Sequence, residues 1–192
     1  MHRTEAVAQL KQVFSVLSRD LDEIVAYGKT NPSPFAHRTL VRTHFALMEG
    51  LAYQLRQVTL ASLAQTDHLT AVEIALLKEE RYALDTKGRP EARENFQTFL
   101  PNLLFTIQCY PKNHGATYQS NTGHHGWEAM RKFVEIRNRI THPKSDALLE
   151  LTETDLKYVV DAASWWKATM LEMLAACAEA DDYWKAKLAQ SP

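Results

Sequence analysis

Residues that interrupt regular secondary structure are scarce in this sequence. Six glycines and seven prolines stand among 192 residues, too few for the many turns of a β-sandwich or a β-barrel. A few long helices are expected instead. The chain is long enough for one well-buried core and short for two, so we expect a single domain over residues 1–192.

Cysteine, charge of one sign and long apolar runs are also lacking. Cys109 and Cys177 are the two cysteines, without the paired spacing of a disulfide framework or a cysteine zinc site, which favours a reducing compartment. A formal net charge of −1 argues against coating of nucleic acid or anionic membrane by bulk electrostatics, so any RNA contact must be local. The chain has no run of about 18 apolar residues, and its first residues are charged and amphipathic. We therefore expect a cytoplasmic protein that does not associate with membranes.

Apolar residues recur at the spacing of an amphipathic helix in five segments. The segments are 4–27, 34–64, 71–84, 127–140 and 153–188. Residues 91–110 have a helical pattern broken by Pro101, which predicts one or two short helices. Residues 111–126 have no periodicity and three glycines, which predicts an irregular loop. The expected fold class is all-α, an up-and-down helical bundle of about five main helices.

Local signals mark several helix starts and ends. Ser33 and Pro34 suit an N-cap and a first helical position. Two further starts have the pattern of a capping box flanked by a hydrophobic staple. The boxes pair Thr70 with Glu73 and Thr152 with Asp155, and the staples pair Leu69 with Ile74 and Leu151 with Leu156. Helix ends are predicted at Gly28, at the turn 88–90, and at His142 before Pro143.

The run RNRITHPK, from Arg137 to Lys144, places a guanidinium, an amide and an imidazole at one helix terminus, a set that suits a phosphodiester. In a helical projection Arg137 falls on the apolar arc, whereas Arg139 points the opposite way into solvent. A cation on an apolar arc should be paired, bound to a ligand or buried at an interface. A simpler alternative is that the cations interact with the helix dipole and that His142 merely precedes the stop proline.

Helix 34–64 holds a second Arg-to-His spacing, from Arg38 to His44. His44 projects into the apolar stripe and is expected to be a core histidine. Glu49 lies near three arginines of the same helix, Arg38, Arg42 and Arg56, which predicts a solvated or intrahelical charge stripe. Pairing of Glu49 with Arg137 is the alternative.

The loop histidines and the tryptophans of the last helix are expected to have no catalytic role. His114, His124 and His125 lie in the polar loop and are expected to be exposed; a zinc site there is the alternative. Trp165, Trp166 and Trp184 are expected to be core or interface anchors, because no basic residues alternate with them as in a base-stacking platform.

The chain resembles the HEPN superfamily, small all-α proteins of prokaryotic toxin–antitoxin and defence systems with relatives among eukaryotic RNA-processing enzymes. The run GWEAMRKFVEIRNRITHPKSDALLELTETDLKYVVD, residues 126–161, looks like the family core, in which a helix ends in Arg-Asn with a His following. Residues 38–41 and 46–51 are similar to its early helix, and residues 77–82 fit more loosely. The resemblance covers roughly residues 34–175, with a poor match over 86–126.

This resemblance implies a metal-independent endoribonuclease without a cofactor, in which the motifs of two subunits of a homodimer face one another. Arg137 would neutralise the scissile phosphate, Asn138 would position it, and His142 would act as general base or acid, while Arg139 and Lys144 would contact the RNA substrate. The 2′-hydroxyl of RNA is the nucleophile, so no metal is needed. The implied products are a 2′,3′-cyclic phosphate and a 5′-hydroxyl.

The resemblance also implies a partner. Some relatives have a tyrosine two positions after the His that a nucleotidyltransferase antitoxin modifies, and here that position is Lys144. The fold also occurs as an inactive module for dimerisation or RNA binding, in which Arg137 would be a structural ion pair. That module is the alternative to the nuclease.

Overall fold

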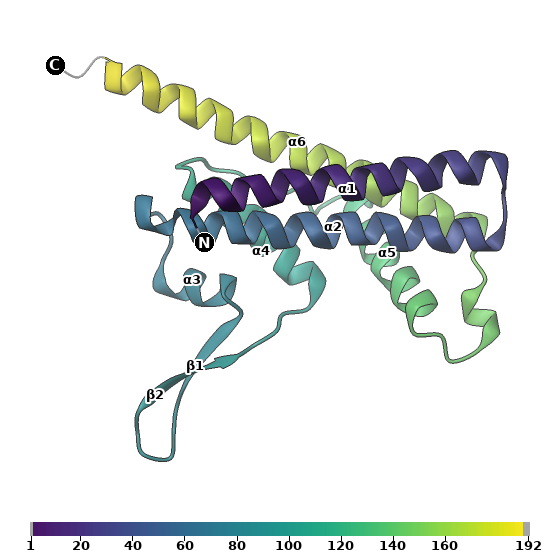
Figure 1. Cartoon of the computed structure of the whole chain (residues 1–192), viewed down its shortest axis with the longest axis horizontal. Helices are drawn as coiled ribbons and strands as arrows, with labels where there is room; N and C mark the ends of the chain where they lie inside the picture. The colour runs from purple at the N-terminus through teal and green to yellow at the C-terminus, as the bar shows by residue number, and fades with distance from the viewer. Residues whose placement is uncertain (1, 190–192) are drawn as a thin grey trace. The chain divides into compact units, whose positions relative to one another are not determined.

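The computed structural model describes residues 2–189, except for the side chains at 65, 184 and 187–189. Its helices and strands follow one another along the chain as shown in Figure 1. They are α1 (Arg3–Thr30), α2 (Pro34–Ser62), the 3₁₀ helix η1 (Leu63–Gln65), α3 (Ala71–Leu77), β1 (Glu80–Leu84), β2 (Pro90–Glu94), α4 (Phe99–Asn113), α5 (His125–Thr141), the 3₁₀ helix η2 (Asp146–Leu149) and α6 (Glu153–Ala189). The fold is a helical bundle with one small sheet, so the predicted all-α class is confirmed.

The chain divides into two compact units, each assembled from segments far apart in sequence. The hairpin unit comprises Met1–Ala8, Ala52–Ser120 and Met173–Pro192, and the motif unit comprises Gln9–Leu51 and Asn121–Glu172. The single-domain expectation stays a prediction.

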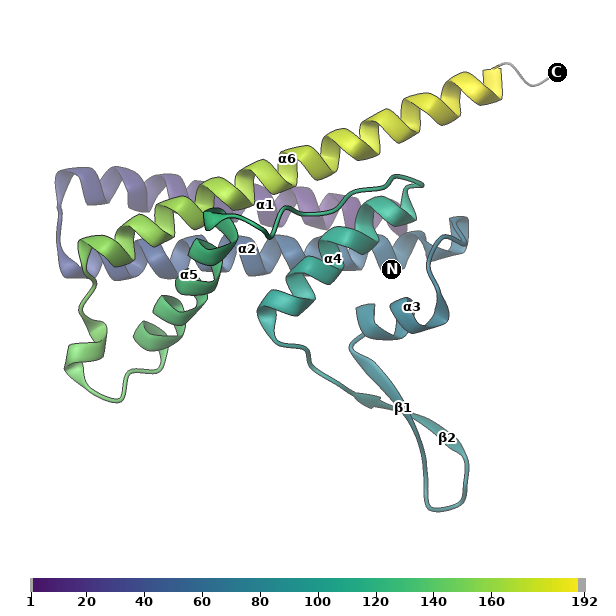
Figure 2. The same cartoon turned by 180° about the vertical axis from the view of Figure 1, so that it is seen from behind.

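In the motif unit, α1 and α2 lie side by side over residues 9–30 and 34–51 (Figures 1 and 2). Gly50 allows this approach, since a Cβ there would come within 2.7 Å of Leu17. The side chain of Phe133 on α5 is fully buried and meets the Phe45 ring edge-on at 5.5 Å between centroids. This aromatic contact joins α2 to α5 and fixes the face that α5 turns to the core.

Helix α6 contributes tryptophans to the same unit. Trp165 and Trp166 are buried, which confirms the expectation of core anchors, whereas the side chain of Trp184 lies outside the described residues. The Trp165 Nε1–H donates to the Asn121 carbonyl at 2.9 Å, so its polar atom is satisfied.

In the hairpin unit, the capping signals are confirmed. The Thr70 hydroxyl accepts the Glu73 N–H, while the Glu73 carboxylate accepts the Thr70 N–H. Leu69 and Leu77 are buried in one cluster, against which Ile74 packs, as the predicted staple requires. Ser33 in the motif unit likewise accepts the Ala36 N–H at 3.2 Å.

The predicted helix 71–84 is wrong beyond Leu77. Glu79 takes a positive φ of 54°, which stops the helix, and its carboxylate is held by Arg56 at 2.8 Å and Asn102 at 3.0 Å. The chain then forms an antiparallel hairpin, β1 with β2. The turn 88–90, predicted to be a helix end, is the tip of this hairpin, where Gly88 has a φ of 74°.

Three smaller boundaries also differ. α1 passes Gly28 and ends at Thr30, where Thr30 itself donates to the Tyr27 carbonyl at 3.1 Å. Pro101 does not break α4, because it lies in the first turn, where its missing N–H has no intrahelical acceptor to lose. The irregular loop is shorter than predicted, since α4 extends to Asn113 and α5 begins at His125.

Candidate functional site

The Arg137–Lys144 segment forms the end of α5 in the motif unit. His142 is the C-cap, and its backbone N–H donates to the Asn138 carbonyl at 3.0 Å. Pro143 then prevents further helix, as predicted. Asn138, His142 and Lys144 are exposed, and the His142 imidazole makes no hydrogen bond to any side chain or backbone group that the structure describes. The segment thus presents one free imidazole at a helix terminus.

Arg137 is paired. Its Nη2 donates to both carboxylate oxygens of Glu49 on α2, each at 3.0 Å, and its Nη1 donates to Asn138 Oδ1 at 3.0 Å. The guanidinium carbon lies 4.2 Å from the centroid of the Phe45 ring. These contacts satisfy the requirement that a cation on the apolar arc be paired. The expectation that Glu49 belongs to a charge stripe with the arginines of its own helix is therefore wrong, and the alternative, pairing with Arg137, is what the structure shows.

The Arg137–Glu49 pair is partly exposed rather than sealed. The side chain of Arg137 is 25% exposed and that of Glu49 is 44% exposed. A guanidinium has five N–H donors, and the Nε–H and one Nη1–H of Arg137 make no hydrogen bond to the described residues. These two N–H groups of the guanidinium therefore remain able to donate hydrogen bonds to an anion such as a phosphate.

Arg139 is not solvated as predicted. Its Nη2 donates to Asp155 Oδ2 at 2.8 Å, with 31% and 15% of the two side chains exposed. Burial of Asp155 acts to raise the pKa of its carboxyl, but hydrogen bonds from Thr152 and the Arg139 guanidinium outweigh burial and hold that pKa below its ordinary value. Arg139 therefore ties α5 to the N-terminal capping box of α6.

Two arginines of α2 hold the segment at and after the end of α5, Arg42 at α5 itself and Arg38 at η2, and the sequence interpretation missed both contacts. Arg42 donates through Nη2 to the Ile140 carbonyl at 2.6 Å, one of the terminal carbonyls without an intrahelical partner. Arg38 donates to the Leu149 carbonyl at 3.5 Å. No sequence signal could have shown these contacts, since the acceptors are backbone atoms about a hundred residues away.

His44 also faces α5. It is half-buried and approaches the Phe133 ring edge-on, with centroids 6.0 Å apart. Burial lowers the pKa of the imidazole below 6.5, because the charged form loses hydration there. The interpretation of His44 as a core histidine agrees with this environment.

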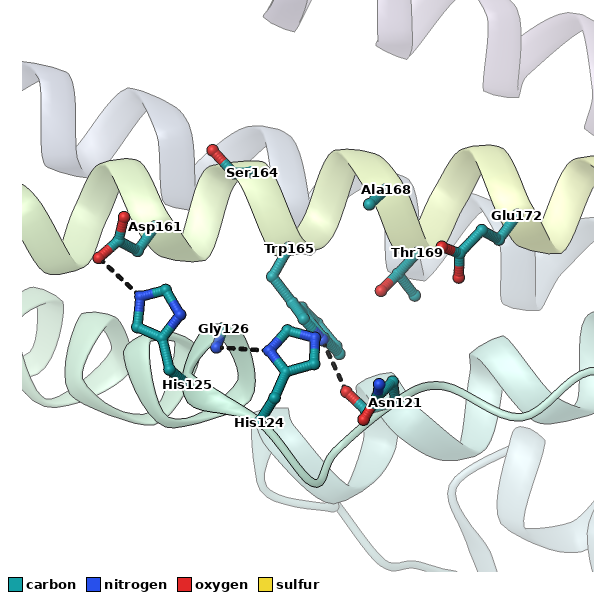
Figure 3. A pocket seen from close by; sticks show the side chains of 10 residues that line it. All are labelled: Asn121, His124, His125, Gly126, Asp161, Ser164, Trp165, Ala168, Thr169 and Glu172. Atoms are coloured by element: carbon teal, nitrogen blue, oxygen red, sulfur yellow. Dashed lines mark hydrogen bonds and ion pairs between the residues drawn. The ribbon is translucent and has the colours of Figure 1, made fainter.

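A pocket of about 370 Å³ lies at the opposite end of α5, between that helix and α6 (Figure 3). His125 Nε2 lies 2.9 Å from Asp161 Oδ2, and His124 Nδ1 accepts the Gly126 N–H at 2.9 Å. Both imidazoles are thus engaged within the chain. Among the residues that the structure describes, no three His, Cys, Asp or Glu side chains are grouped so as to hold a metal ion, so nothing favours the zinc alternative.

No protein-family model, curated protein or solved structure matches the chain. The resemblance to the HEPN superfamily therefore stays a prediction. In the described part of the chain, the helices lack the combination of length and apolar content that crossing a bilayer would need.

Proposed function

We propose that the chain is a metal-independent endoribonuclease of the toxin or defence kind, acting at the C-terminal end of α5. The supporting observation is the gathering of Arg42, Arg137 and the exposed His142 at one helix terminus. Cations with free N–H groups suit a phosphate, and an exposed imidazole suits proton transfer. Arg139 and Lys144 lie beside them in sequence and are proposed to contact the RNA backbone.

The proposed chemistry uses the RNA's own nucleophile. The 2′-oxygen bonds to phosphorus as the bond from phosphorus to the 5′-oxygen breaks, giving a 2′,3′-cyclic phosphate and a 5′-hydroxyl. One imidazole takes the 2′-hydroxyl proton, and a second group gives a proton to the 5′-oxygen. Arg137 neutralises the charge that develops on the phosphoryl oxygens while Asn138 positions the phosphate. A homodimer would supply the second imidazole, and a nucleotidyltransferase-type antitoxin is the proposed regulatory partner.

A second candidate is favoured by the Arg137–Glu49 pair. A guanidinium neutralised by a carboxylate of its own chain behaves as a structural ion pair, and the protein would then be a non-catalytic module for dimerisation or RNA binding. The two candidates differ in what Glu49 does. In the nuclease, Glu49 competes with phosphate for Arg137; in the module, it only stabilises α5 against α2.

Cleavage of RNA in excess chelator tests the proposal. His142→Ala and Arg137→Ala should each reduce the rate at least about a hundredfold, since general acid–base catalysis and charge stabilisation contribute effects of that size. Arg131→Ala, an exposed arginine of the same helix, and His68→Ala, an exposed histidine of the hairpin unit, are matched controls that should cleave like the wild type. End analysis should find 2′,3′-cyclic phosphates.

Glu49→Gln separates the candidates further. It keeps the shape of the side chain and removes the charge that competes with phosphate, so the nuclease should bind RNA more tightly. Equal cleavage by the wild type, His142→Ala and Arg137→Ala would show that the activity belongs to another site or to a contaminant. Absence of cleavage by every protein, with Glu49→Gln altering only stability, would favour the module.

A further inference from the structure

The β1–β2 hairpin of the hairpin unit has an exposed apolar face. Tyr82 is 65% exposed and Leu84 is 66% exposed, and their cross-strand partners are Ala92 and Pro90. In both views the hairpin extends away from α3 and α4 of its own unit (Figures 1 and 2). A two-stranded sheet alone in water is marginal, and within the described residues neither edge of this sheet has a further strand.

The hydrogen-bond pattern of the hairpin determines which groups its outer edge offers. The Asn95 N–H donates to the Glu79 carbonyl at 2.7 Å, and the Asp85 N–H donates to the Arg89 carbonyl at 2.9 Å. These are hydrogen-bonded pairs of the ladder, so in β2 the odd-numbered residues face β1. The outer edge of β2 therefore offers the N–H and carbonyl of Ala92 and Glu94 and the carbonyl of Pro90.

We propose that β2 pairs antiparallel with β2 of a second copy of this chain, across a two-fold axis at Ala92. In this register Ala92 and the partner's Ala92 exchange two hydrogen bonds. Each Glu94 N–H donates to the carbonyl of the partner's Pro90, so the missing proline N–H leaves one Glu94 carbonyl on each copy without a donor. The two hairpins become one four-stranded sheet.

The charges of β2 complement themselves in this register. Glu91 faces the partner's Arg93, and Arg93 faces the partner's Glu91, in the non-hydrogen-bonded pairs whose side chains approach most closely. The same residues already pair within the chain, so the four charges form one network. Pairing through β1 instead would centre on Tyr82 and set Arg81 against alanine and Glu80 against leucine. The edge of β2 is therefore the favoured one.

The same assembly also shields part of the exposed apolar face of the hairpin from water. Tyr82 stands directly opposite Ala92 in the hairpin, and the two small alanines at the axis leave space between the rings of Tyr82 and the partner's Tyr82. The two tyrosine backbones would lie about three strand spacings apart, ~14 Å, close enough for the rings to cover the alanines from both sides. The apolar face is thereby partly removed from water.

A cysteine at the axis tests the geometry directly. Opposed residues in a hydrogen-bonded antiparallel pair have Cα atoms about 5.5 Å apart, within the range of a disulfide. Ala92→Cys should therefore form a covalent dimer under mild oxidation, seen on a non-reducing gel. Tyr82→Cys is the matched control, since it lies on the same face one strand away and should remain monomeric on that gel. Cys109 and Cys177 are buried and do not compete.

Charge exchange tests the interface without cross-linking. Sedimentation should show a concentration-dependent dimer for the wild type. Arg93→Glu should raise its dissociation constant at least about tenfold, and the exchanged variant Glu91→Arg/Arg93→Glu should restore it. A wild type that is monomeric at every concentration, equal cross-linking of Ala92→Cys and Tyr82→Cys, or a charge exchange that does not restore association would each overturn the proposal. None of these readouts depends on RNA cleavage.

Discussion

The contact between Glu49 and Arg137 is the interaction whose strength most directly tests the arrangement of the motif unit. We predict a coupling free energy of about 1 kcal/mol between the two side chains, at the upper end of exposed ion pairs. The value is not larger because Glu49 is 44% exposed and water screens the pair. It is not near zero because Arg137 is three-quarters covered and is also held by Asn138.

A double-mutant cycle measures this coupling. Urea unfolding of the wild type, Glu49→Ala, Arg137→Ala and the double variant gives four free energies of unfolding. Arg137→Ala alone should cost about 2 kcal/mol, because it also loses the contact with the Phe45 ring, worth about 0.5–1 kcal/mol. A coupling below about 0.3 kcal/mol would show that the pair does not hold α5 to α2. A coupling of about 3 kcal/mol or more would show a sealed, buried pair and would contradict an Arg137 available to phosphate.

Three further predictions concern other parts of the chain. Burial lowers the pKa of His44 below 6.5, so between that lowered pKa and about pH 6.5 the unfolded chain binds a proton that the folded chain does not. The free energy of unfolding should therefore fall as pH falls through 6.5, and His44→Phe should weaken that dependence; equal slopes for the two proteins would contradict it. Burial raises the pKa of Cys109 to about 12 and that of Cys177 to about 11. Iodoacetamide at about pH 8 should therefore alkylate both thiols only after unfolding. Labelling of the native protein would show that the folded chain opens around these cysteines. Thr70→Ala removes the capping box of α3 and should lower Tm by about 2–4 °C, for a loss of about 1 kcal/mol; an unchanged Tm would mean that α3 is held by its packing alone.

Local patterns in the sequence predicted most of the helices. The capping box at Thr70 and the N-cap at Ser33 depend on residues three positions apart, and both form as expected. The capping pattern of Thr152 with Asp155 also forms, with the Thr152 N–H donating to the carboxylate at 2.9 Å. Signals of this kind are reliable because both partners lie within one helical turn.

The hairpin shows where local patterns fail. Residues 80–84 continue the apolar spacing of the preceding helix, yet Glu79 leaves the helical region. The turn at 85–89 is closed by Asp85, whose carboxylate accepts the N–H groups of Lys87 and Arg89. An aspartate at the start of a turn with glycine following is a recognisable signal for a turn. The helical spacing of the apolar residues before it favoured a continued helix instead.

The candidate site was predicted only in part. The sequence indicated that Arg137 needs a partner, and it named Glu49 as one alternative. It did not indicate Arg42, whose acceptor is the Ile140 carbonyl, and it placed Arg139 in solvent although Asp155 binds it. Whether the motif cleaves RNA stays a prediction.

By itself the sequence determined that this protein is helical, where most helices begin, and that a guanidinium, an amide and an imidazole stand together at one helix terminus. These features follow from contacts within a few residues, which the order of amino acids specifies directly. Only the tertiary structure decided that Arg137 is neutralised by Glu49 and that residues 80–94 form a hairpin with an open edge. Such contacts depend on which faces of separate elements meet. Glu49 and Arg137 are 88 residues apart, and no periodic pattern in the sequence indicates a pairing over that separation.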